Sequence, residues 1–139
     1  MTHQPPSIVV LDDDTDFLDL NARMLQRAGY RVRTFSTSAQ AMSAILQDPP
    51  DLIITDLMME NLDSGFTFSQ AVKDDPRLKS VPVIVITAMT SQRGYDFRPR
   101  TQDDLAAMNA EAFFEKPVDY DKLIAKVHEI LNKRPGELT

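Results

Sequence analysis

Polar side chains that can do chemistry follow four of the apolar runs of this sequence. In chain order they are Asp12 and Asp13 after residues 8–11, Asp56 at the end of 51–56, Thr87 at the end of 81–87, and Lys116 after 112–115. Two or three carboxylates with water suit a hard divalent cation such as Mg²⁺, and a carboxylate beside such an ion can attack phosphorus. A lysine and a hydroxyl can bind the phosphoryl oxygens. The residue types therefore indicate metal-assisted phosphoryl chemistry centred on Asp56.

The apolar runs have the lengths and compositions of β-strands. We expect strands at residues 8–11, 30–35, 51–56, 81–87 and 112–115. The runs before Asp12 and Asp56 are apolar almost throughout, which is typical of strands buried on both faces. The run 30–35 instead alternates Arg31 and Arg33 with less polar side chains, which indicates an edge strand with one face in water.

Two amphipathic patterns predict helices in the first half of the chain. The first helix is expected to end at Gly29, which suits a C-terminal cap, and its spacing predicts buried positions at Phe17, Leu20, Met24, Leu25 and Ala28. Thr37 and Gln40 form a capping-box pattern that opens the second helix. The apolar residues of this helix are Ala41, Met42, Ile45 and Leu46. Pro49 and Pro50 end it.

Three further helices are expected after residue 60. A turn over 60–65 leads into a helix of about ten residues, which Pro76 stops and whose buried face comprises Phe68, Ala71 and Val72. Thr101 and Asp104 can cap a short helix with Leu105 and Met108 inward. The last helix carries Leu123, Ile124, Val127, Ile130 and Leu131 and stops before Pro135.

Strands that alternate with helices predict one parallel sheet with helices on both faces. All strands of a parallel sheet end at the same edge, so Asp12, Asp13, Asp56, Thr87 and Lys116 are expected to converge there. Strand-end aspartates are common and many only cap loops, so the convergence is the informative feature. Acids gathered in this way are costly to hold together unless a cation lies among them.

Composition limits the classes of protein that need be considered. The 139 residues suit one domain, and 42% hydrophobic with 26% charged residues is ordinary for a globular protein. A net charge of −6 gives no footprint for nucleic acid or an anionic membrane surface. There is no cysteine for disulfides or thiolate metal sites, and no apolar stretch approaches a membrane span or signal segment. We expect a cytoplasmic protein.

Four motifs make the chain resemble the receiver domain of a two-component response regulator. They are Val-Leu-Asp-Asp-Asp at 10–14, Asp-Leu-Ile-Ile-Thr-Asp-Leu-Met-Met at 51–59, Val-Ile-Thr-Ala at 85–88 and Phe-Phe-Glu-Lys-Pro at 113–117. The resemblance covers residues 7–133, leaving a tail at 1–6 and a tail or linker at 134–139. It implies the flavodoxin-like (βα)5 fold, a doubly wound parallel sheet of order 2-1-3-4-5, with the acids beside its switch point.

The resemblance also implies a role for each motif residue. Asp56 would be the phosphoacceptor, and Lys116 the phosphoryl-binding lysine. Asp12, Asp13 and Asp56, with the backbone carbonyl of Met58, would hold Mg²⁺, with Mn²⁺ as an alternative. Thr87 would be the switch hydroxyl and Phe113 the switch aromatic, although an aromatic here also suits an ordinary core or surface position.

The family's mechanism implies partners rather than turnover of a substrate. A sensor histidine kinase or a phosphotransfer protein would donate the phosphoryl group. The Thr87 hydroxyl would then move to bond it, Phe113 would turn inward, and the face formed by residues 104–108, 112–115 and 123–131 would signal a downstream partner or effector domain. A phosphorylation-dependent homodimer is one form of output. We expect no direct nucleic-acid or membrane binding and no enzymatic activity beyond slow self-dephosphorylation.

Three departures from the family pattern set this chain apart. Glu60 stands where a proline is usual, and the loop after it is one residue longer. The segment between Thr87 and Lys116 is also long; its Tyr, Phe and Arg residues at 93–100 suit either a partner-contact element or a solvated surface loop. Met58 and Met89 are apolar where the family controls the attacking water, which predicts slow loss of the phosphoryl group.

Two other protein classes fit these residues less well. A phosphatase with an aspartate nucleophile would need a second acid two residues past Asp56, where Met58 stands. A pseudo-receiver that serves only for docking usually lacks an acid or the lysine, and neither is missing here. Whether residues 134–139 form a natural tail or the start of a linker is left open, with a slight preference for a single-domain regulator or an excised domain.

Overall fold

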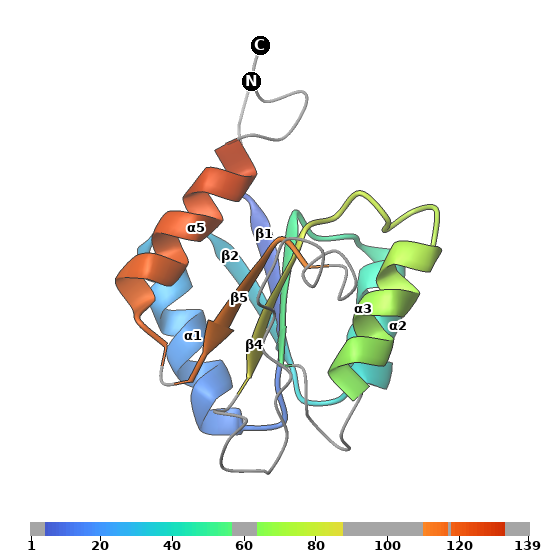
Figure 1. The fold of residues 1–139 in the computed structure, drawn as a ribbon, viewed down its shortest axis with the longest axis horizontal. Coiled ribbons are helices and arrows are strands. Elements are labelled where there is room, and N and C mark those ends of the chain that lie inside the picture. Colours follow the sequence, from blue (N-terminus) through green and yellow to red (C-terminus); the bar gives the residue numbers. More distant parts are fainter. Residues whose placement is uncertain (1–4, 57–63, 88–109, 117, 133–139) are drawn as a thin grey trace.

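The computed structural model describes residues 5–56, 64–87, 110–116 and 118–132, which form five strands and four helices. Their bounds are β1 Ser7–Leu11, α1 Thr15–Arg27, β2 Arg31–Phe35, α2 Ser38–Gln47, β3 Leu52–Asp56, α3 Ser64–Asp74, β4 Val83–Thr87, β5 Ala112–Glu115 and α5 Tyr120–Asn132. Strands and helices alternate along most of the chain (Figure 1). The predicted short helix near Leu105 and Met108 lies outside the described residues.

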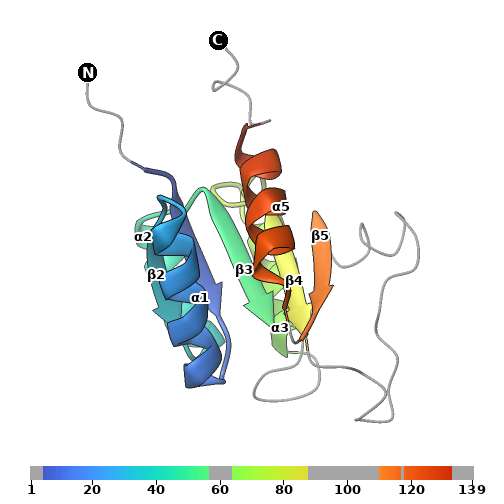
Figure 2. The same ribbon diagram turned by 90° about the vertical axis from the view of Figure 1, so that its left-hand side faces the viewer.

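The sheet has the order β2-β1-β3-β4-β5, and every pair of neighbouring strands is parallel. This confirms the flavodoxin-like sheet predicted from the sequence. Strand β2 is the outermost strand on one side of the sheet, as predicted. The alternation predicted that Arg31 and Arg33 would face water, but the exposed residues are Arg31 and Thr34. Arg33 is half-buried because its guanidinium binds Asp48. The three central strands are apolar because helices cover both of their faces. Their carboxyl ends all lie at the same edge of the sheet (Figure 2).

Each face of the sheet has its own buried core. Helices α1 and α5 pack on one face and α2 and α3 on the other (Figures 1 and 2). Alternate residues of a strand serve alternate cores, since successive side chains point to opposite faces. In β1, Ile8 and Val10 join the α1/α5 core, whereas Val9 and Leu11 join the α2/α3 core. The two cores fix the sheet as a rigid base for the residues at its carboxyl edge.

Local signals set the helix ends. The Asp14 side chain caps α1 by accepting from the backbone N–H groups of Asp16 and Phe17 at 3.1 and 3.2 Å. After α1, Gly29 has a φ of 101°, a left-handed conformation that residues with a Cβ rarely adopt. Thr37 caps α2 through a 3.3 Å bond from the N–H of Gln40, which is the forward half of the predicted capping box.

Some predicted buried positions were wrong. Leu20 is 47% exposed, because α1 turns Leu18 rather than Leu20 toward the sheet, together with the predicted Leu25. Ala71 of α3 is exposed, although Phe68 and Val72 are buried as predicted. In each helix the spacing was compatible with more than one rotation about the helix axis, and packing against the sheet selected one of them.

Three strands begin one residue away from their predicted starts, and two boundaries differ by more than that. Strand β4 begins at Val83 rather than Val81, because Pro82 has no N–H to give to the sheet. Helix α3 begins at Ser64, inside the turn expected over 60–65.

None of the described helices is long and apolar enough to cross a membrane. Met58, Glu60, Met89 and the segment 93–100 lie outside the described residues.

Candidate metal and phosphoryl site

The acids predicted to converge do lie together at the carboxyl edge of the sheet. Asp56 is the last residue of β3, and Asp12 directly follows β1, which pairs with β3. The Asp12 N–H donates to the carbonyl of Phe35 at 3.1 Å and so extends the β1–β2 pairing by one residue. One carboxylate oxygen from each of Asp12, Asp13 and Asp56 lies within 4.8 Å of the others. This arrangement brings three anionic oxygens close enough to share one cation.

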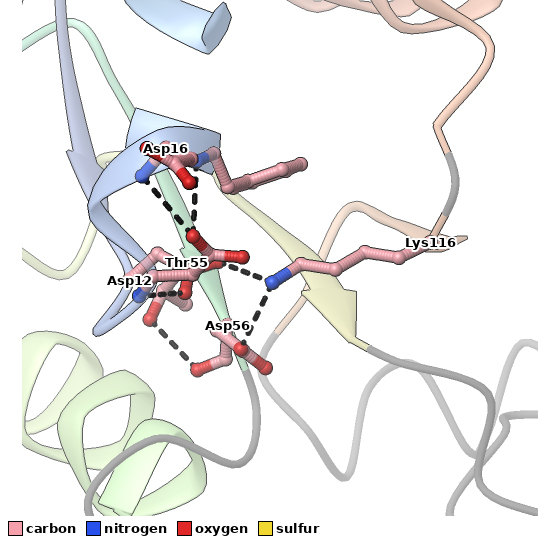
Figure 3. A network of polar contacts seen from close by, with 7 residues as sticks. Asp12, Asp16, Thr55, Asp56 and Lys116 are labelled. Carbon is pink, nitrogen blue, oxygen red and sulfur yellow. Dashed lines mark hydrogen bonds and ion pairs between the residues drawn. The ribbon is translucent and has the colours of Figure 1, made fainter. Parts of the chain in front are cut away.

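Lys116 directly follows β5, and its side chain extends from the carboxyl end of that strand into the acidic group. Its Nζ lies 2.7 Å from Asp12 Oδ2 and 3.4 Å from Asp56 Oδ2 (Figure 3). The sequence predicted a pair with Asp56, and the structure adds a shorter contact with Asp12. The side chains of Asp12, Asp56 and Lys116 are 1%, 6% and 19% exposed, so water screens the charges weakly.

Burial and proximity shift the ionisation of these groups. Burial raises the pKa of the Asp12 carboxyl from 3.8 to about 6, and hydrogen bonds from Lys116 and the Asp14 N–H only partly oppose it. Burial alone would lower the pKa of Lys116. The hydrogen bond to Asp12 and the charges of Asp56 and Asp12 outweigh it, so the pKa is raised. Lys116 is therefore a persistent cation, whereas an ionised Asp12 is held at a free-energy cost.

The three consecutive acids at 12–14 have different surroundings. Asp12 is buried, and its Oδ1 accepts from the Asp14 N–H at 2.9 Å. Asp13 is exposed, which leaves the acidic group open to solvent on that side. Asp14 points its oxygen to the start of α1 as the N-cap. The third acid therefore shapes the loop, and only the first two join the acidic cluster.

Sequence reasoning missed three residues around the site. Thr55 is fully buried, and its Oγ1 donates to the carbonyl oxygen of Asp56 at 3.1 Å (Figure 3). The ring of Phe17, in the first turn of α1, has the Lys116 Nζ 4.2 Å from its centroid. The hydroxyl of Tyr120, the first residue of α5, is buried, and burial followed by the charge of Asp12 raises its pKa. The sequence carries a local signal for a helix cap such as Asp14, which is an Asp just before an acidic first turn. It carries no such signal for the contacts of Thr55, Phe17 and Tyr120.

The predicted switch residues are placed only in part. Thr87 ends β4 and is paired with Glu115 of β5, so its backbone lies at the carboxyl edge beside the acids. Its side chain is outside the described part of the chain. Phe113 pairs with Val85 and packs, half-buried, against the α2/α3 core. The roles assigned to these two residues stay predictions.

The donor set fits a small divalent cation. All three groups are carboxylates, the hard oxygen ligands that Mg²⁺ prefers, and one of them faces solvent, where bound water can complete the coordination. Three carboxylates and one ammonium leave two negative charges uncompensated, which matches the charge of such an ion. Burial raises the pKa of Asp12, so a cation beside this carboxylate would also offset the cost of keeping it ionised.

Comparison with known proteins places these features in a family. A model of the response regulator receiver domain matches residues 8–128. The chain is 31% identical over 130 residues to the DNA-binding dual master transcriptional regulator RpaA of Synechocystis, an alignment that covers 92% of this chain and 50% of RpaA. It is 33% identical over 129 residues to the response regulator PleD of Caulobacter vibrioides, covering 88% of this chain and 25% of PleD. The chain thus spans half or less of these relatives.

Solved structures agree on the fold. A crystal structure of a putative response regulator from Chloroflexus aurantiacus matches with a TM-score of 0.78 and 25% identity, covering 93% of this chain and 99% of that one. The chemotaxis response regulator CheY4 of Vibrio cholerae matches with a TM-score of 0.75 over 91% of this chain and 98% of that one. At 24% identity this second likeness concerns the fold alone. Both therefore agree with the parallel sheet described above.

Proposed function

Because the chain belongs to the response regulator receiver domain family, we propose that it accepts a phosphoryl group on Asp56 in a Mg²⁺-dependent reaction and signals its phosphorylated state to another protein or domain. A sensor histidine kinase or a phosphotransfer protein is the proposed donor. The proposal rests on one observation: the side chains of Asp12, Asp13, Asp56 and Lys116 lie close together at one edge of the sheet.

In the proposed transfer, a carboxylate oxygen of Asp56 attacks the phosphorus of a phosphohistidine. The new P–O bond forms as the P–N bond breaks, and the electron pair of the P–N bond leaves with the imidazole nitrogen. Lys116 neutralises charge on the phosphoryl oxygens as it moves from the carboxylates toward them. Its raised pKa supports this role, because the ammonium keeps its charge at neutral pH.

Asp12, Asp13 and Asp56 are the proposed metal ligands, with the carbonyl of Met58 as a further one from the family pattern. Bound Mg²⁺ would clamp the phosphoryl oxygens and offset the charge that develops on them. The chain's own contribution is to hold two of the three carboxylates buried in fixed positions, so that little reorganisation is needed when the group arrives.

The proposed output is a shift in population between two forms of the domain. The Thr87 hydroxyl is proposed to bond the phosphoryl group and Phe113 to turn inward, which alters the face that includes β5 and α5. The position of Thr87 at the end of β4, beside β3, supports this proposal. We further propose that the receiver domain spans residues 7–133, between tails at 1–6 and 134–139, since β1 begins at Ser7 and α5 ends at Asn132.

A phosphoryl analogue tests the site without a kinase. Beryllofluoride added with Mg²⁺ should give a bound ¹⁹F resonance that disappears when the metal is chelated. Asp56→Asn has nearly the same shape and should show no such resonance. Asp51→Asn, at the opposite end of β3, removes the same charge and should retain it. A bound resonance that survives in Asp56→Asn, or that needs no metal, would contradict the proposal.

A further inference from the structure

The surroundings of the Lys116 ammonium include a contact that carries no charge. Two sides of the ammonium face carboxylates, at 2.7 Å from Asp12 and 3.4 Å from Asp56. A third side faces the ring of Phe17, with Nζ 4.2 Å from the centroid. A cation over an aromatic face at this distance is attracted by the ring quadrupole, more strongly where water is excluded. With 19% of the lysine side chain exposed, water is largely excluded here.

The Phe17 ring is held by rigid parts of the fold. Its backbone N–H donates to the Asp14 cap at 3.2 Å, in the first turn of α1. The ring packs, half-buried, against the α1/α5 core, and the neighbouring Leu18 is buried in that core. The ring is therefore a neutral surface held in place by the α1/α5 core and by the first turn of α1.

The carboxylate contacts of Lys116 must change when the site is loaded, whereas the ring contact need not. A metal ion on Asp12 competes with the ammonium for the same carboxylate, and a phosphoryl group on Asp56 offers the ammonium new oxygens. A neutral ring holds the ammonium from one side and forms no ion pair with it that must break when the ammonium moves toward the phosphoryl group. We propose that Phe17 is a positioning residue that keeps Lys116 aimed at the phosphoryl position during this exchange. The inference rests on the proposed function, in which Lys116 binds the phosphoryl group.

Graded fluorination of the Phe17 ring tests the proposal with little change in shape. Mono-, di- and trifluorophenylalanine at position 17 weaken the ring quadrupole step by step. The maximal rate of Asp56 phosphorylation by acetyl phosphate, at saturating Mg²⁺, should fall step by step with it. Phe17→Leu should be roughly threefold to tenfold slower than the parent, while Phe17→Tyr should retain most of the rate. The same fluorination series at Phe114, which packs against the same core from β5, should leave the rate unchanged.

A spectroscopic readout separates this inference from the proposed function. In the parent, the ring current of Phe17 should shift the ¹⁵N-ammonium protons of Lys116, and Phe17→Leu should remove that shift. If the phosphorylation rate is the same for all the fluorinated variants, the proposal is overturned. This holds even if Phe17→Leu is slow, because the ring would then act only by its shape. If the parent itself is not phosphorylated, the proposed function fails. In that case the ammonium proton resonance of Lys116 shows whether the ring holds the lysine. If Phe17→Leu leaves this resonance unshifted, the inference is overturned.

Discussion

At the scale of single residues, the site holds one ammonium among carboxylates that also suit a metal ion. Lys116 lies closer to Asp12 than to the proposed acceptor Asp56, by 2.7 against 3.4 Å. The lysine therefore occupies part of the space and charge that a divalent cation would use. This competition has a measurable consequence, because removing the lysine should affect metal binding and phosphorylation in opposite directions.

Lys116→Met should bind Mg²⁺ about threefold more tightly or better, since it removes a positive charge at contact distance from a carboxylate of the proposed metal site. It should also slow phosphorylation of Asp56, because the phosphoryl group loses its cation. Titration of Mg²⁺ followed by backbone amide NMR shifts measures the first effect. Lys126→Met makes the same change of net charge on α5, where Lys126 pairs with Glu129, and should leave both properties unaltered. Weaker or unchanged Mg²⁺ binding by Lys116→Met would argue against the competition.

At the scale of helices and strands, local interactions fix the two ends of α1. The loop from β1 enters the helix through Asp14, whose N–H bonds Asp12 while its side chain caps the first turn. The far end is closed by Gly29 in a left-handed conformation. Each end offers a substitution whose effect on stability can be calculated from a known local cost.

Asp14→Ala should lower the free energy of unfolding by about 1 kcal/mol, because the N–H groups of Asp16 and Phe17 lose their acceptor. Asp14→Asn keeps an accepting oxygen and should cost far less. Denaturant unfolding of the two variants and the parent measures the difference. If Asp14 were a metal ligand instead of a helix cap, Asp14→Ala and Asp14→Asn would both weaken Mg²⁺ binding, by about the same factor. Without metal, the free energies of unfolding of the two variants would then be nearly equal.

Gly29→Ala should cost about 1 kcal/mol for a different reason. A Cβ at this position would meet no atom within 4 Å, so the cost comes only from the φ of 101°. Gly29→Asn should be milder, since Asn tolerates the left-handed region better than Ala. Thermal unfolding of the two variants provides the comparison. Equal melting temperatures for Gly29→Ala and the parent would mean that the turn relaxes to negative φ at no cost.

Strand ends are easier to predict from this sequence than the rotation of a helix about its axis. The convergence of Asp12, Asp13, Asp56 and Lys116 was predictable, because the end of a strand fixes where the next residue lies in a parallel sheet. The rotation of α1 was not. Apolar residues at Phe17, Leu18 and Leu20 allow more than one buried face, and packing against β-strands far away in the sequence exposed Leu20. The contact of Phe17 with Lys116 depends on that rotation, so no local pattern could reveal it.

At the scale of the whole molecule, the sheet separates two cores and carries the site on its edge. The acids and the lysine lie where β1, β3 and β5 end, and the two cores lie on either side of them. The site therefore lies at the end of the sheet, between the two helical layers. The family match spans residues 8–128 and so includes nearly all of the described fold.

The most direct test of the account is the phosphorylation of Asp56 itself. The protein is incubated with acetyl phosphate and Mg²⁺, and intact-mass spectrometry is followed by localisation of the modified residue. One phosphoryl group should be added to the parent at Asp56, its addition should require the metal, and Asp56→Asn should gain none. No added mass on the parent, or an equal addition to Asp56→Asn, would contradict the claim that this edge of the sheet is a metal-assisted phosphoryl acceptor.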